Sequence, residues 1–443
     1  MVWLMCGTGI LVSLTGWSLW NRRLAPESAA FLFVLATLTA AALAGYLFGG
    51  INITRGSAAA FAITAPESLE AAWILLRFSF IFLVSSVVLH LFVRRPLTSS
   101  KNNQRSRRSR QSLESTFGRH IVNAIVLLLT IYVLVLYPLI GTAVLSRDEY
   151  LFLAAGSLGA LAGTVSLPLA LVAMTVAVGT DRGSVRLWSA TVLLLVLTFE
   201  VSKASRAAAG VMVFAGFIYF LLSRSSLPKR LLGLFVGIVL GSLTLVIVLQ
   251  LRGSDIGHGM LPYIELLTSG DVTLSSERWE SAVLNLMATI PITYLSSTVA
   301  VPDNLTFVSL SPLPGELAGW YEISSSQVLF RAVPTNAYGQ VAAMESIEGW
   351  VCIFLIAGLM SASAIVRSYG IPAVQMPLMF FSSTMTILTS ILFMQYSIRT
   401  GTRWLWLALG VTVMVSVLSR LMQRRVPVSR AMQGAARVGT WPA

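Results

Sequence analysis

The chain has 443 residues, of which 56% are hydrophobic and only 11% are charged. Soluble proteins carry about 25% charged residues, so a water-soluble fold would leave too much apolar surface exposed. The net charge is +13, but the basic residues gather in short stretches beside apolar segments. The positive-inside rule of membrane proteins explains this pattern, so we expect no nucleic-acid partner. With two cysteines, three histidines and no Cys/His group at zinc-ligand spacing, we also expect no metal and no cofactor.

Eleven apolar segments follow one another along the chain, and each is long enough to cross a membrane as a helix. The first has no basic residues before it, and Arg22 and Arg23 follow it, so we expect a retained helix rather than a signal peptide. The sequence therefore predicts an all-α polytopic membrane protein with about eleven transmembrane helices. The expected spans are 2–20, 28–49, 71–93, 120–144, 150–179, 187–202, 207–223, 231–250, 347–366, 372–396 and 402–421.

Loop charge predicts how these spans alternate across the membrane. Every strongly basic stretch falls on one face if the N-terminus lies outside and the C-terminus lies in the cytoplasm. Residues 1–250 then hold eight spans, with a basic cytoplasmic loop at 94–119 that is too polar to bury a core and is expected to be disordered. Residues 251–346 form one large extracytoplasmic loop, and residues 347–443 hold the last three spans and a basic cytoplasmic tail.

The large loop is not low in complexity, so we expect it to fold. Ser275 or Ser276 can cap a helix whose apolar face includes Trp279, and Pro291 limits that helix. Turn-forming residues dominate the stretch SLSPLPGELAGWYE that follows. The loop is therefore expected to pack as short helices over a cavity open to the outer face, and not as an independent β-domain.

Lys203 and Arg206 stand at the expected outer end of two helices, in the stretch LTFEVSKASRAAAG. They are three residues apart and so are neighbours on a helical face, among small residues that let a ligand approach. One interpretation is a pair of snorkelling bases with Glu200 as partner. We favour a clamp for a lipid phosphate, because arginine presents a planar fork to phosphate and this face is otherwise poor in bases.

Arg77 interrupts the apolar run AAWILLRFSFIFL. A charged side chain inside a span either snorkels to the surface, here about two turns away, or faces a partner or a polar cavity within the bundle. The sequence leaves both interpretations open.

The large loop supplies further candidates. Bases on this face and aromatic rings beside hydrogen-bonding groups suit an anionic ligand that carries sugars. A general base for a hydroxyl group would come from Glu345, Glu322, Glu280 or His258. The candidate substrate-binding residues are Arg77, Arg252, Arg278, Arg331, Trp279, Trp320, Tyr338 and Asn336.

Three stretches carry a family resemblance: KASRAAAG, SSERWESAVLNLMATI, and PLPGELAGW followed by VPTNAYGQVAAMESIEGW. They resemble elements of the Wzy-type polysaccharide polymerases, especially the branch that polymerises enterobacterial common antigen. The number of spans and the single long outer loop in the second half are similar too. The chain departs from the family where KAS replaces a glycine-containing approach to Arg206. The spaced Arg-to-Gly motifs of some polymerases are also missing at Arg252, Arg278 and Arg331.

The resemblance implies an enzyme of the bacterial inner membrane, a glycosyltransferase that joins undecaprenyl-pyrophosphate-linked oligosaccharide repeat units at the outer face. Such polymers serve as O-antigen or exopolysaccharide. The catalytic residues would be Arg206, Lys203, Glu345 and His258. The partners would be the lipid-linked oligosaccharides, membrane lipids, a chain-length-regulating copolymerase and a flippase.

Other functions stay open at this point. A flippase or transporter of lipid-linked glycans is the main alternative, although much of the polar sequence lies in one loop. An O-antigen-ligase-like transferase is another, although the late His-Asn motif of those ligases is absent. A lipid-phosphate-sugar glycosyltransferase and a non-enzymatic assembly scaffold are further possibilities.

Overall fold

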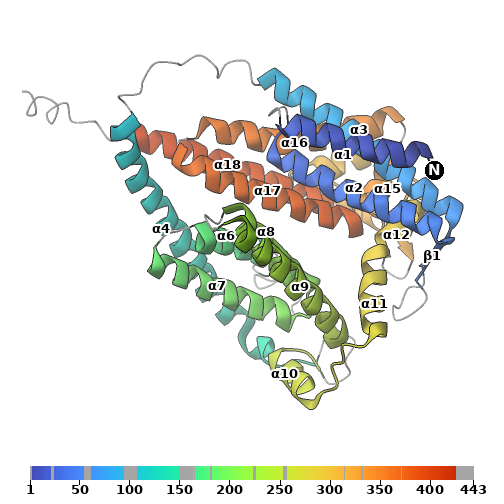
Figure 1. Cartoon of the computed structure of the whole chain (residues 1–443), viewed down its shortest axis with the longest axis horizontal. Helices are drawn as coiled ribbons and strands as arrows, with labels where there is room; N and C mark the ends of the chain where they lie inside the picture. The colour runs from blue at the N-terminus through green and yellow to red at the C-terminus, as the bar shows by residue number, and fades with distance from the viewer. Residues whose placement is uncertain are drawn as a thin grey trace, which may run out of the picture.

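In a computed structural model the chain folds into helices that form two groups, here called the first and second lobes (Figure 1). The structure describes residues 2–20, 24–53, 61–93, 107–148, 163, 165–179, 182–222, 226–252, 257–313, 315–330, 333–344, 346–370 and 372–425.

The first lobe joins the two ends of the chain. In Figure 1 the blue helices α1–α3 lie beside the orange and red helices α16–α18, and α2 and α3 pack directly on α17 and α16. Phe31, Phe82 and Phe393 are buried in the common core. The helices are α1 (Val2–Trp20), α2 (Pro26–Leu47), α3 (Ala65–Val93), α16 (Ser346–Tyr369), α17 (Pro372–Gln395) and α18 (Ile398–Arg425).

The second lobe comes from the middle of the chain, teal and green in Figure 1. Its α8 and α9 approach closely because glycines meet at the crossing: a Cβ at Gly237 would lie 2.6 Å from the Cα of Gly216. Small residues allow such backbone approach in membrane helices. Contacts of α17 with α4 and α6 connect the lobes. The elements are α4 (Arg107–Ile140), the 3₁₀ turn η1 (Gly141–Val144), α6 (Ser166–Gly179), α7 (Gly183–Ser202), α8 (Arg206–Leu222) and α9 (Leu227–Arg252).

Seven helices in the described part of the chain are long and apolar enough to cross a membrane. Their apolar spans are Glu27–Leu47, Ala65–Leu91, Val122–Val144, Gly183–Ser202, Leu227–Leu251, Ile347–Tyr369 and Ile398–Leu421. Shorter apolar helices run over Leu4–Ser18, Ser166–Val178 and Phe381–Gln395. The expectation of an all-α, multi-pass membrane protein is confirmed, and the count of eleven spans stays a prediction. Much of the expected span at 150–179 lies outside the described residues.

The basic stretch at 94–119 differs from expectation in its second half. Residues 94–106 lie outside the described residues, but α4 already begins at Arg107. The expectation of disorder assumed that a segment unable to bury apolar surface stays unfolded. This segment is instead the amino-terminal extension of a membrane helix, and a nucleated helix propagates into polar sequence without needing a core of its own.

The segment between α9 and α16, here called the connecting segment, folds into short pieces. Its described residues form six short helices and one two-stranded hairpin. The α11 helix ends at Met287. To continue the helix, the Met287 carbonyl would have to accept a hydrogen bond from the backbone N–H of residue 291, and Pro291 has none. The elements are α10 (Met260–Ser269), α11 (Ser276–Met287), α12 (Thr289–Ser297), α13 (Leu305–Leu310), α14 (Trp320–Ser324), β3 (Val328–Phe330), β4 (Val333–Pro334) and α15 (Ala337–Ala343). A second hairpin, β1 (Gly50–Ile53) with β2 (Phe61–Thr64), joins α2 to α3. The end of the lobes that carries the connecting segment is called the loop end below.

A buried arginine ties the connecting segment to the first lobe. Arg399, at the start of α18, is only 2% exposed, and its guanidinium donates hydrogen bonds to the backbone carbonyls of Val308 and Leu313. It also lies 5.8 Å from the ring centroid of Trp320. These charge-assisted hydrogen bonds hold the turn after α13 against α18, and no carboxylate among the described residues pairs with Arg399.

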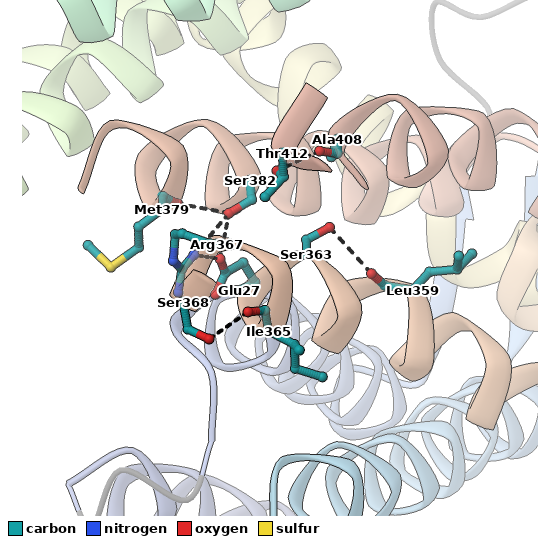
Figure 2. Close-up of polar contacts among 10 residues, drawn as sticks. All are labelled: Glu27, Leu359, Ser363, Ile365, Arg367, Ser368, Met379, Ser382, Ala408 and Thr412. Carbon is teal, nitrogen blue, oxygen red and sulfur yellow. Dashed lines mark hydrogen bonds and ion pairs between the residues drawn. The ribbon is translucent and has the colours of Figure 1, made fainter. Parts of the chain in front are cut away.

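At the opposite end, a buried ion pair joins α2, α16 and α17 (Figure 2). Arg367 donates to the Oε1 atom of Glu27, which is fully buried, and the Ser382 hydroxyl donates to the same oxygen at 2.5 Å. Figure 2 shows the three side chains converging from three helices. A charge buried among apolar helices needs such a partner, because desolvation of an unpaired ion is costly.

Candidate functional site

Lys203 and Arg206 lie on a tight turn between α7 and α8, which we call the basic turn (residues 203–206). The Ser205 N–H bonds to the Glu200 carbonyl at 3.1 Å, and the Ala204 N–H bonds to the Val201 carbonyl at 2.8 Å. These two bonds define a Schellman motif, the usual way for a helix to end in a left-handed residue. The left-handed residue is Ala204, with φ of +49°.

Ala204 stands where glycine is the common choice, and packing holds it there. A left-handed residue with a Cβ costs about 1–2 kcal/mol. Ala204 is 1% exposed and belongs to a core cluster with Val248, Leu251 and Tyr263 from α9 and α10. Packing of the Ala204 methyl group in this cluster therefore offsets the strain of the left-handed backbone.

A buried carboxylate neutralises one of the two bases. Glu200 is 2% exposed, and its Oε1 atom accepts hydrogen bonds from the Ser166 hydroxyl and, at 2.8 Å, from the Lys203 ammonium. The Lys203 ammonium also lies 4.5 Å from the centroid of the Phe199 ring. Lys203 thus holds the end of α7 in place, and Arg206, half-buried at the start of α8, is the second base of this turn.

Arg147 is a base that the sequence analysis did not single out, and it links His258 to the basic turn. Its guanidinium donates to the Ser202 carbonyl at 2.8 Å, and its backbone pairs with that of His258 through two bonds of 2.8 Å. These residues are far apart in sequence, so no local pattern could have related them. Through Arg147, the structure brings His258 to the same region as Lys203.

His258 itself is buried and lies 2.9 Å, through Nδ1, from the Tyr263 hydroxyl. Burial lowers its pKa below the usual value, and the charge of Arg147 lowers the pKa further. The neutral imidazole is therefore favoured at pH 7. The associated stability is complete above the usual histidine pKa of about 6.5 and is lost as the pH falls through the lower folded-state value.

A second feature is a hollow of about 250 Å³ at the loop end of the first lobe, here called the Arg77 hollow. Two predicted substrate-binding residues, Arg77 and Tyr338, line it together. The Arg77 guanidinium lies 6.0 Å from the ring centroid of Trp350. No carboxylate pairs with it among the described residues, although a central arginine costs about 2.5–3.5 kcal/mol on insertion scales. The lining residues are Glu70, Trp73, Ile74, Arg77, Phe78, Ile81, Tyr338, Val341, Ala342, Met344, Gly349, Trp350 and Ile353.

Several other predicted site residues have scaffold contacts. Asn336 is fully buried and caps α15, since its Oδ1 accepts the Gly339 N–H at 2.9 Å and its amide nitrogen donates to Thr293 at 2.7 Å. These bonds use the amide within the fold, so we assign Asn336 to the scaffold instead of to substrate binding. Trp320 lies beside the buried Arg399.

The remaining predicted residues are not gathered at either feature. Arg278 is exposed and Trp279 half-buried on α11. Arg252 is the last residue of α9, next to Leu251, which packs against Ala204. Arg331 and Glu345 lie outside the described residues. Within the described part of the chain, no three metal-ligating side chains come together.

The fold and these sites define a multi-pass α-helical membrane protein with the basic turn and the Arg77 hollow toward the loop end. Comparison of the chain with known protein families, with curated proteins and with solved structures gave no match. Its function is therefore argued from its own residues.

Ala204 gives a direct test of the basic turn. Ala204→Gly should leave stability nearly unchanged, because relief of about 1–2 kcal/mol of left-handed strain offsets the loss of a buried methyl, about 0.8 kcal/mol, and the flexibility of glycine. Ala204→Val should lose at least about 2 kcal/mol, because a β-branched residue fits neither this conformation nor the packed site. Thermal unfolding in detergent would measure both. A valine variant as stable as the parent would contradict the left-handed turn.

Proposed function

We propose that this protein is a membrane glycosyltransferase that polymerises oligosaccharide repeat units linked to undecaprenyl pyrophosphate, at the outer face of the bacterial inner membrane. The observation that carries the proposal is the basic turn, in which Arg206 begins a helix among small residues while Lys203 is fixed by Glu200. A helix amino terminus and a guanidinium together favour a phosphate group. The likeness of KASRAAAG to the polymerase element supports the same residue.

The proposed reaction joins two lipid-linked glycans. An acceptor hydroxyl of the incoming unit attacks the anomeric carbon of the growing chain, the bond from that carbon to the pyrophosphate oxygen breaks, and the lipid pyrophosphate leaves. Arg206 stabilises the negative charge that develops on the leaving group. The hydroxyl proton passes to a base, for which the neutral His258 and Glu345 are the candidates.

The products separate this proposal from its alternatives. Cells that lack the gene should accumulate single lipid-linked repeat units, and the purified protein should convert such units into a ladder of longer chains. Full-length chains that are left unattached in the deletion strain would indicate a ligase. Units retained on the cytoplasmic side of the membrane would indicate a flippase. Either result would refute the polymerase.

The proposed orientation has its own test. In a variant with Cys6→Ser and Cys352→Ala, a cysteine introduced at Asp271 should react with a membrane-impermeant maleimide added outside, because the connecting segment is expected to be extracytoplasmic. A cysteine at Arg105 should react only after the membrane is permeabilised. Labelling of position 105 in intact cells would overturn the orientation.

A further inference from the structure

The Arg77 hollow opens on the part of the first lobe that faces lipid. It lies between α3 and α16, both of which are long enough to span a membrane. Trp73 and Trp350, two of its lining residues, are 50% and 53% exposed. Large apolar side chains exposed on a span are in contact with lipid, so a lipid molecule is the natural occupant of this hollow.

The charges in the hollow are arranged along the membrane normal. Glu70 and Arg77 both line it and are seven residues apart on α3, hence on one face and separated by about 10 Å of helix rise. Glu70 lies nearer the loop end, and Arg77 lies deeper. Neither side chain has an ion-pair partner among the described residues. Beyond Arg77, the side chains of Phe78, Ile81 and Ile353 provide an apolar wall.

We infer that this hollow binds a phospholipid with an ethanolamine head group, taken from the leaflet at the loop end. The phosphodiester lies on the Arg77 guanidinium, the ammonium group points toward the surface and Glu70, and an acyl chain lies against Phe78, Ile81 and Ile353. The flexible two-carbon link of such a lipid lets the ammonium extend from the phosphate toward the surface, in the same order as Arg77 and Glu70. The inference does not depend on the proposed polymerase activity.

Charge balance favours this lipid over two others. A phosphatidylglycerol head group would bring a phosphate to Arg77 but would leave the Glu70 carboxylate without a cation. A lipid pyrophosphate would bring more negative charge than one guanidinium beside a carboxylate can neutralise. The basic turn, where Lys203 and Arg206 lie close to the Arg147 guanidinium on the Ser202 carbonyl, is the better match for a pyrophosphate, and it lies in the other lobe.

Lipid titration followed by native mass spectrometry tests the inference with the full chain in detergent. Phosphatidylethanolamine and phosphatidylglycerol with identical acyl chains are compared on the parent and on Arg77→Gln, Glu70→Gln and Arg403→Gln. Arg403 is the matched control, because it is an exposed arginine near the loop-end start of α18 and does not line the hollow. Gel filtration and thermal unfolding confirm that each variant is folded.

The parent should retain one phosphatidylethanolamine more tightly than phosphatidylglycerol. Arg77→Gln should weaken that binding by about tenfold to a hundredfold, the effect of losing a hydrogen bond to a charged group. Glu70→Gln should remove the preference between the two lipids, and Arg403→Gln should change neither. Equal binding of both lipids by the parent, or unchanged binding by Arg77→Gln, would refute the inference. Displacement of phosphatidylethanolamine by an equal amount of polyprenyl phosphate would assign the hollow to a glycan carrier instead and overturn it.

Discussion

Replacing Arg206 by alanine should lower the rate of polymer formation by about a hundredfold or more, the usual effect of removing a group that stabilises charge in a transition state. Arg206→Lys should also be impaired, because lysine keeps the charge but loses the planar fork that binds two phosphate oxygens. The measurement is polymer length and yield on a gel, with protein abundance determined in parallel.

Arg206 is a cleaner probe than Lys203. Removing Lys203 would leave the buried carboxylate of Glu200 without its cation, so a lost activity could reflect a misfolded turn. Lys229→Ala is a suitable control, because Lys229 is an exposed base at the start of α9, outside the basic turn. If Arg206→Ala accumulates normally and makes full-length polymer, Arg206 is a surface base and the proposed site is wrong.

Breaking the buried ion pair at the opposite end should be the most destabilising single change. Glu27→Ala leaves Arg367, whose side chain is only 12% exposed, without its carboxylate. Removing one partner of a buried pair typically costs about 3–5 kcal/mol. Arg367→Ala should cost a similar amount, whereas Ser382→Ala removes only one donor to the Glu27 carboxylate and should cost about 1–3 kcal/mol.

The double variant Glu27→Leu with Arg367→Met separates pairing from packing. Apolar side chains of similar size remove both charges together, so most of the stability should return. Thermal or denaturant-induced unfolding of the parent, Glu27→Leu, Arg367→Met and the double variant in one detergent gives the coupling energy of the pair. A double variant whose loss equals the sum of the two single losses would show that the pair does not interact.

The transmembrane helices were the feature that the sequence predicted best, because they depend on long apolar runs. The transmembrane segments were recognisable because lipid demands about 20 apolar residues in a row, and seven helices now meet that requirement in the described residues. The amino-terminal part of α4 was missed because high charge density was taken to mean disorder. Residues 107–119 instead continue an apolar helix whose stability comes from the membrane-embedded part.

Pairings between distant segments could not be predicted from one sequence. No local sequence pattern relates Glu27 to Arg367, or Arg147 to His258. The sequence around Arg399 likewise does not indicate that its guanidinium bonds to backbone carbonyls of the connecting segment. The Arg77 hollow is an intermediate case. The charge inside an apolar run was a clear signal, but Tyr338 and Trp350, which complete the hollow, lie 261 and 273 residues farther along the chain. The left-handed conformation of Ala204 was not predicted, because alanine gives no local signal for a positive φ.

The first lobe has a consequence for the order in which the protein is made. Its amino-terminal helices, blue in Figure 1, are synthesised long before the carboxy-terminal helices that they pack against, in orange and red. Glu27 precedes Arg367 by 340 residues. At a synthesis rate of about 5–20 residues per second, roughly 17–70 s pass between the synthesis of Glu27 and the synthesis of Arg367. The whole second lobe enters the membrane in that interval. A nascent chain released before α16 therefore carries the Glu27 carboxylate without the cation that pairs with it in the folded protein.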